Sequence, residues 1–172
     1  MTPHFSSLIR NIPDFPLPGV QFKDITPLLQ DAAAFRQVID ELAGRYEGQR
    51  VDLVAGVESR GFIFSAPVAY RLGAGLIPIR KPGKLPAETI EVAYSLEYGT
   101  NTLQVHRDAL QPGTRVLLVD DLLATGGTIR AAAQLMEQLG GEVVELAFVI
   151  ELAFLHGRDN LAQYPIFSLV QY

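Results

Sequence analysis

Residues 116–128 limit the possible folds more than any other part of the sequence. Four apolar residues, 116–119, are followed at once by two acids, and the small residues 124–128 come next. Apolar residues then recur at helical spacing: Ile129, Ala132, Ala133, Met136 and Leu139. A continuous apolar run predicts a strand covered on both faces, as in a parallel sheet with helices on either side.

The rest of the chain shows the same alternation of strands and helices. An apolar stripe predicts a helix that starts near Asp31 and includes Phe35, Val38, Ile39, Leu42, Ala43 and Tyr46. Residues 61–72 read as a second helix, and apolar runs predict strands at residues 51–57, 76–79, 143–150 and 166–170. We therefore predict an α/β fold with a mostly parallel central sheet flanked by helices. The length of 172 residues fits a single domain over residues 1–172.

Residues 81–102 interrupt this alternation. Pro, Gly and Lys are followed by alternating β-forming residues and then by Glu97, Tyr98 and Gly99, a pattern that predicts a β-hairpin with its tip at these three residues. Long excursions from a compact core often act as lids. We therefore expect a flexible lid at about residues 81–104.

Composition excludes several classes of function. Fourteen Lys and Arg against nineteen Asp and Glu give a net charge of -5, which argues against a basic surface for nucleic acid. The apolar stretch 61–79 is interrupted by Pro67, Arg71 and Gly73, so it does not predict a membrane helix. The sequence has no cysteine and no apolar leader at its start, so we expect a soluble, cytoplasmic protein. The three histidines are scattered and receive no role.

Asp120 and Asp121 stand at the carboxyl end of the predicted strand, where open α/β sheets bind their ligands. The loop of Ala124, Thr125, Gly126, Gly127 and Thr128 opens a helix, whose free N–H groups and positive dipole end favour a phosphate. The lysine of a nucleotide P-loop is absent, and two carboxylates suit the vicinal hydroxyls of a sugar. A ribose 5-phosphate satisfies both halves of the segment.

The segment also resembles the phosphoribosyl pyrophosphate (PRPP) motif of the type I phosphoribosyltransferases. Four further stretches, residues 15–25, 58–62, 80–86 and 94–99, resemble segments of the adenine phosphoribosyltransferases in that family. The resemblance implies the type I phosphoribosyltransferase fold with a hairpin hood. It also implies purine salvage, in which the 5-phosphoribosyl group of PRPP passes to adenine and gives AMP and pyrophosphate.

The resemblance assigns roles around the donor. Asp120 and Asp121 are expected to bind the ribose hydroxyls, and the loop of Ala124, Thr125, Gly126, Gly127 and Thr128 the 5′-phosphate. Six residues are expected at the pyrophosphate: Glu58, Ser59, Arg60, Arg80, Lys81 and Lys84. Independently, Arg60 follows a predicted strand and offers a planar fork that matches phosphate oxygens. Mg²⁺ is the expected cofactor, held by substrate and water rather than by a purely protein site.

The resemblance also assigns the base site. Ala124 occupies the position where hypoxanthine-guanine enzymes carry an aspartate, so Glu97 is expected to exchange the proton at purine N7, with Tyr98 as a lid aromatic that excludes water. The backbone of Gln21, Phe22 and Lys23 within the base-binding segment 1–30 is expected to read adenine, with Phe22 and Leu152 on the two faces of the base. Gln21 and Lys23 depart from the apolar residue and the arginine seen in some relatives. A homodimer is implied, with Arg80 reaching the partner subunit.

Two other functions stay open at the level of sequence. One is a phosphoribosyltransferase for guanine, xanthine or orotate. Ala124 argues against the hypoxanthine-guanine class, and no cation is evident that would suit an acidic base. The other is a regulator that keeps the fold but binds nucleic acid, against which stand the negative net charge and Glu97 on an intact lid.

Overall fold

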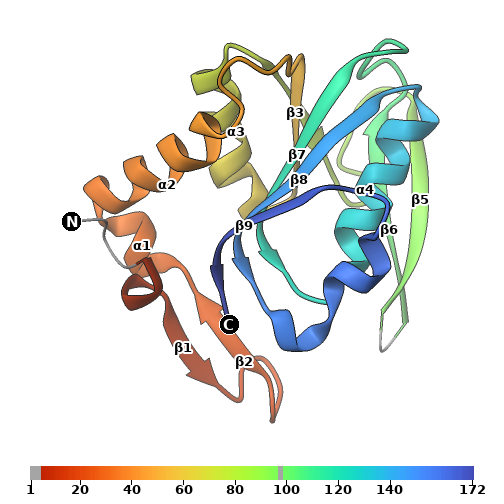
Figure 1. Ribbon diagram of the computed structural model, residues 1–172. Coiled ribbons are helices and arrows are strands. Elements are labelled where there is room, and N and C mark those ends of the chain that lie inside the picture. The colour runs from red at the N-terminus through yellow and green to blue at the C-terminus, as the bar shows by residue number, and fades with distance from the viewer. Residues whose placement is uncertain (1–4, 97–98) are drawn as a thin grey trace.

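The computed structural model describes residues 5–96 and 99–172. Its centre is a five-stranded sheet with the order β4-β3-β7-β8-β9, and each neighbouring pair is parallel (Figure 1). The strands are β3 (Leu53–Val57), β4 (Gly75–Ile79), β7 (Arg115–Leu123), β8 (Glu142–Glu151) and β9 (Ile166–Gln171). The predicted α/β fold is confirmed. The strand predicted at residues 51–57 starts later, at Leu53, and β7 continues past Val119 to Leu123.

Helices cover both faces of this sheet. The helices α2 (Ala32–Gly44) and α3 (Arg60–Leu72) lie on one face, and α4 (Gly127–Gln138) lies on the other (Figure 1). Side chains alternate along β7, so Leu117 and Val119 join the core under α2 and α3, whereas Val116 and Leu118 join the core under α4. Each fully buried side chain of this kind contributes roughly 1.5–3 kcal/mol, which explains the two-sided apolar pattern of β7.

The start of α2 agrees with the sequence. Asp31 occupies the N-cap, and its Oδ1 accepts hydrogen bonds from the N–H groups of Ala33 at 3.0 Å and Ala34 at 2.9 Å. The helix ends at Gly44, so Tyr46, which continues the apolar stripe, lies beyond it. Tyr46 is nevertheless buried, and its hydroxyl donates to Glu145 Oε2 at 2.7 Å.

Two antiparallel hairpins flank the sheet. One joins β5 (Thr89–Leu96) to β6 (Gly99–His106), which confirms the predicted hairpin but carries it beyond Thr102 to His106. The other joins β1 (Arg10–Pro13) to β2 (Gln21–Asp24) and was not predicted. Between this second hairpin and α2 lies the short helix α1 (Thr26–Gln30).

Short 3₁₀ turns complete the chain: η1 (Phe5–Leu8), η2 (Ala153–Leu155) and η3 (Gly157–Leu161), the last two between β8 and β9. Within residues 5–96 and 99–172, none of the helices has the length and apolar character to cross a membrane. Because the central strands are parallel, the loops after β3, β7 and β8 emerge at the same edge of the sheet.

Candidate active site

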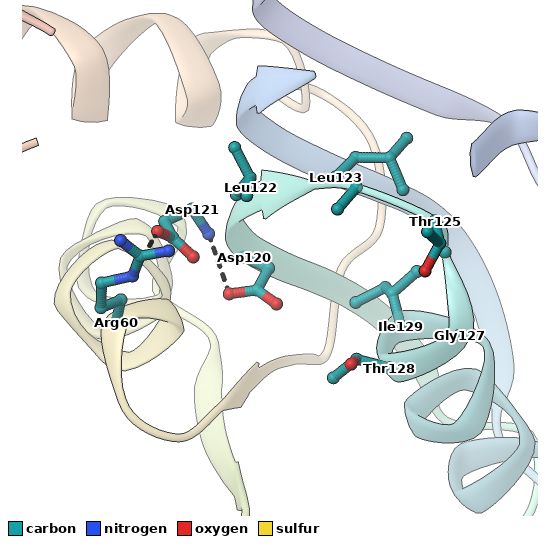
Figure 2. A pocket seen from close by; sticks show the side chains of 11 residues that line it. Arg60, Asp120, Asp121, Leu122, Leu123, Thr125, Gly127, Thr128 and Ile129 are labelled. Carbon is teal, nitrogen blue, oxygen red and sulfur yellow. Dashed lines mark hydrogen bonds and ion pairs between the residues drawn. The ribbon is translucent and has the colours of Figure 1, made fainter. Parts of the chain in front are cut away.

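A pocket opens where β7 extends beyond its neighbour β3. The pairing of β7 with β3 stops at Val119, opposite Gly56, but its pairing with β8 continues to Leu123, opposite Glu151. From Asp120 onward one side of β7 is therefore free of β3. There the pocket encloses about 220 Å³ and is lined by Arg60 and by residues 120–129 (Figure 2). The predicted sugar-phosphate segment thus forms nearly the whole wall of one pocket.

The acid pair lies on the strand wall of this pocket. Asp120 Oδ1 accepts a hydrogen bond from the N–H of Asp121 at 2.9 Å, and Arg60 Nε forms an ion pair with Asp121 Oδ2 at 2.8 Å (Figure 2). Asp121 is only 5% exposed, and its Oδ2 accepts no hydrogen bond from any group that the structure describes. The acid pair therefore retains acceptor capacity for donors that arrive with a ligand.

Burial sets the electrostatics of the two carboxyl groups. Removal from water raises the pKa of Asp120 well above its ordinary value, and the negative charge of Asp121 adds to this rise. Burial also raises the pKa of Asp121, although the positive charge of Arg60 opposes the shift. Hydroxyl donors or a cation placed between the two groups would offset this accumulation of negative charge.

Gly61 allows α3 to approach β7 closely enough to place Arg60 beside the acids. A Cβ atom at Gly61 would stand 2.7 Å from Asp120 Oδ1 and 3.4 Å from the carbonyl oxygen of Val119. The first distance is too short for any side chain unless Asp120 moves. The absence of a side chain at this position is therefore part of the site.

The loop from β7 to α4 presents free backbone donors. Gly126 stands at the N-cap of α4 with a φ of 88°, a left-handed conformation that favours glycine. Among the described residues no side chain caps this helix start, so the first N–H groups of α4 have no side-chain acceptor. Figure 2 shows Thr125 and Thr128 on this loop and first turn, with the acid pair on β7. The arrangement suits a phosphate dianion.

Tyr94 is a neighbour of this loop that the sequence did not single out. Thr128 Oγ1 donates a hydrogen bond to the hydroxyl of Tyr94 at 3.3 Å. The available signal was alternation along β5, which puts Ile90, Val92 and Tyr94 on one face, packed toward the α4 side of the core.

Three of the four cationic residues predicted at the pyrophosphate, Arg80, Lys81 and Lys84, bond Glu58 at the end of β3, whereas Arg60 pairs with Asp121. The side chain of Glu58 is 6% exposed and accepts from Lys84 Nζ at 2.8 Å, Arg80 Nε at 2.9 Å and the N–H of Lys81 at 3.1 Å. Burial alone would raise the pKa of Glu58, but these hydrogen bonds outweigh it and lower the pKa. Ser59 stands at the N-cap of α3, directly before Arg60.

Phe22 and Leu152, predicted on the two faces of the base, each contact a residue of the pocket wall. The guanidinium of Arg60 lies 5.0 Å from the ring centre of Phe22 on β2, so Arg60 touches both this ring and Asp121. Leu152 is buried directly after β8, and its N–H donates to the carbonyl of Leu123 in the pocket wall at 2.9 Å.

The flanking residues of β2 are held by other contacts. Gln21 Oε1 accepts from Asn11 Nδ2 at 2.7 Å, and Lys23 Nζ stands 3.8 Å above the ring of Tyr172. Glu97 and Tyr98, the predicted catalytic and lid residues, lie outside the described residues, so their roles stay predictions.

Comparison with known proteins gives a consistent result. The family model described as "Phosphoribosyl transferase domain" matches residues 25–166. The chain is 67% identical over 172 residues to an adenine phosphoribosyltransferase of Roseiflexus sp. (strain RS-1), with 100% of both chains covered.

Two solved structures extend this similarity to the fold. The adenine phosphoribosyltransferase of Thermoanaerobacter pseudethanolicus superposes with a TM-score of 0.97 at 55% identity, covering 100% of each chain. The enzyme of Saccharomyces cerevisiae, solved with an imino-altritol bisphosphate and adenine, gives a TM-score of 0.91 at 38% identity, covering 96% of each chain.

Proposed function

Because the chain belongs to the adenine phosphoribosyltransferases, we infer that it transfers the 5-phosphoribosyl group of PRPP to adenine and releases AMP and pyrophosphate. The observation that carries this function is that one pocket is lined both by an acid pair, of which Asp121 is buried and Asp120 half-buried, and by an uncapped helix start. The acid pair suits sugar hydroxyls and the helix start suits a phosphate, and the donor carries both groups on its ribose 5-phosphate.

Asp120 and Asp121 are proposed to accept hydrogen bonds from the two ribose hydroxyls. The raised pKa values of both acids support this role, because bound hydroxyls would relieve the cost of the charge held away from water. The N–H groups and threonine hydroxyls of residues 124–128 then fix the 5′-phosphate. Because the acids bind the hydroxyls of the ribose and the loop binds its 5′-phosphate, C1′ is oriented for attack by the base.

Pyrophosphate is proposed to bind Arg60, which pairs with Asp121, together with Arg80, Lys81 and Lys84, which bond Glu58. A carboxylate would repel pyrophosphate, so Glu58 is proposed to act by holding Arg80 and Lys84 near the site. Ser59 supplies the turn that places Arg60. These cations stabilise the negative charge that develops on the leaving group.

Mg²⁺ is the proposed cofactor. Its fit is supported by the acid pair, because carboxylate oxygens are the ligands this ion prefers and both acids line the pocket. Bound together with the donor, the ion would supply positive charge to the pyrophosphate oxygens. Within the described residues no group of three or more acids or histidines could hold a metal ion alone.

Adenine is proposed to lie between Phe22 and Leu152, with the backbone of residues 21–23 reading its amine and ring nitrogen. The contact of Phe22 with Arg60 supports this position, because Arg60 joins the base segment to the acid pair. Ala124 has no acid-base capacity, so Glu97 is proposed to exchange the proton at N7 while Tyr98 excludes water.

Several wider features are also proposals. Residues 1–172 form one domain, in which segment 1–30 binds the base and residues 81–104 act as the lid. The bond between Tyr94 and Thr128 supports the lid, because it brings the β5–β6 hairpin against the phosphate loop. A cytoplasmic homodimer, in which Arg80 reaches the partner subunit, is proposed from the family resemblance. Gel filtration and cell fractionation would test it.

A panel of purine bases tests the function. With PRPP and Mg²⁺, adenine should yield AMP and pyrophosphate, whereas guanine, hypoxanthine and xanthine should yield at most about 1% of that rate, as expected for mismatched buried hydrogen bonds. Comparable turnover of another base, or none with adenine, would refute the proposal.

The catalytic assignment needs a separate test. Glu97→Gln should lower single-turnover AMP formation about 100-fold, the usual size of a lost general acid or base. Glu91→Gln is the matched control on the same hairpin, because Glu91 bonds only Gln104 among the described groups. Equal rates for the two variants would remove Glu97 from the mechanism.

A further inference from the structure

Residues 152–161 follow β8 and include η2 and η3. They lie directly against the loop that carries the proposed 5′-phosphate site. At one end of this segment the N–H of Leu152 donates to the carbonyl of Leu123 at 2.9 Å. At the other end Asn160 Nδ2 donates to the carbonyl of Thr125 at 3.0 Å. We call residues 152–161 the brace.

The brace touches the phosphate loop backbone to backbone. A Cβ atom at Gly126 would stand 2.7 Å from the carbonyl oxygen of Gly157 and 3.3 Å from Leu161 Cδ1. A Cβ atom at Gly157 would collide with the carbonyl oxygen of Ala124. With no side chain between the two segments, the loop cannot shift toward the brace without displacing it.

The brace itself is anchored to the sheet by an ion pair between the exposed Arg158 and the buried Glu151. Arg158 Nε and Nη2 donate to the two carboxylate oxygens of Glu151, each at 2.6 Å, and Glu151 is 4% exposed. Ser168 Oγ on β9 also donates to Glu151 Oε2 at 2.6 Å. The hydrogen bond from Arg158 is the main reason why the pKa of Glu151 is lowered, so the carboxylate stays charged and the anchor intact at neutral pH.

The bond from Asn160 fixes the direction of a peptide group in the loop. In a planar trans peptide the C=O and the following N–H point opposite ways. With the carbonyl of Thr125 held toward Asn160, the N–H of Gly126 points away from the brace. Gly126 lines the pocket, whereas none of the described residues of the brace lines it. The N–H of Gly126 therefore points to the side of the loop on which the pocket lies.

From these contacts we propose that the brace holds the 5′-phosphate loop in its binding conformation, with Asn160 and Gly157 as positioning residues and the Arg158–Glu151 pair as their anchor. The proposal rests on the proposed function, because it takes a ribose 5-phosphate group as the ligand of the loop. It adds a set of residues that act on donor affinity without touching the donor.

The test removes the amide of Asn160. Asn160→Leu keeps the approximate shape of the side chain but deletes the donor to Thr125. The matched control is Gln49→Leu, because Gln49 Nε2 donates to the carbonyl of Arg45, also at 3.0 Å, near the amino ends of the strands. Calorimetry with ribose 5-phosphate measures the loop, and KM values for PRPP and adenine measure the two substrate sites separately.

Loss of one such hydrogen bond should weaken ribose 5-phosphate binding and raise KM for PRPP about 3- to 10-fold. KM for adenine and the Tm should match those of Gln49→Leu. Gly157→Ala, which displaces the carbonyl of Ala124, should weaken ribose 5-phosphate binding about tenfold or more while the circular dichroism spectrum stays that of the wild type.

The proposal is overturned if both brace variants bind ribose 5-phosphate like the wild type. It is also overturned if Asn160→Leu lowers the Tm and raises both KM values equally, because that pattern indicates general loosening. Failure of the proposed function would look different, since the wild type itself would then form no AMP from adenine and PRPP.

Discussion

Gly61→Ala adds a single methyl group at the point where α3 meets the acid pair. The new Cβ would stand 2.7 Å from Asp120 Oδ1, whereas ordinary contact begins at 3.4 Å. The carboxylate must therefore move by about 0.7 Å, the difference between these two distances, or α3 must withdraw and take Arg60 with it. Both movements disturb the proposed ribose site.

A displacement approaching 1 Å at a positioning group costs up to about 100-fold in rate. We therefore expect Gly61→Ala to lower kcat/KM for PRPP about 10- to 100-fold, equivalent to roughly 1.4–2.7 kcal/mol of transition-state stabilisation. Steady-state kinetics at saturating adenine measure this loss. Circular dichroism checks that the α/β fold is retained.

Gly44→Ala is the matched control. Gly44 is also a helical glycine, at the end of α2, but a Cβ there would meet nothing within 4 Å. Replacing glycine by alanine in a helix stabilises it by about 0.5–1 kcal/mol, so this variant should keep full activity and a Tm at least equal to that of the wild type. Wild-type kcat/KM for PRPP in Gly61→Ala would refute the proposed need for close packing at Asp120.

Three further predictions follow from the charges of the site. Asp120→Asn should abolish turnover yet raise the Tm at pH 7 by about 2–4 °C, the shift that 1 kcal/mol gives in a domain of this size. Because burial raises the pKa of Asp120, the wild-type carboxyl costs stability increasingly as the pH rises above about 4, its unfolded pKa, toward its folded pKa. Differential scanning calorimetry should therefore show a larger gain at pH 8 than at pH 4, and an equal gain would contradict the assigned shift. Glu58→Gln should raise KM for PRPP roughly 5- to 10-fold, because Arg80 and Lys84 lose their charged acceptor, whereas a lower KM would mean that Glu58 competes with pyrophosphate for them. Arg60→Lys keeps the charge but loses the planar fork, so steady-state assays should show KM for PRPP about tenfold higher; an unchanged KM would exclude a forked contact.

The parts of the fold that the sequence predicted are those set by local patterns. The order of β7, phosphate loop and α4 follows from neighbouring residues, because apolar runs, glycines and helical spacing act over short distances. Asp31 likewise marked the start of α2 because its side chain bonds the next turn. The β1–β2 hairpin was not predicted because its strands are only four residues long, contain mostly polar residues and include Pro13 at the end of β1.

The contacts that shape the site join residues far apart in the chain. The residues next to Gly61 in the sequence do not indicate that its lack of a side chain leaves space for Asp120. The arrangement of Arg80 and Lys84 around Glu58 likewise depends on how β3 and β4 pair. Asn160 reaches Thr125 only because β8 runs parallel to β7 and ends beside Leu123, at the edge of the sheet where the phosphate loop begins.

The crystal structure of the protein with bound AMP tests the site most directly. We expect the 5′-phosphate to accept hydrogen bonds from the N–H groups of residues 126–128, the ribose hydroxyls to face Asp120 and Asp121, and adenine to stack against Phe22. A phosphate bound at Lys84 instead, or AMP outside the pocket formed by Arg60 and residues 120–129, would contradict this expectation.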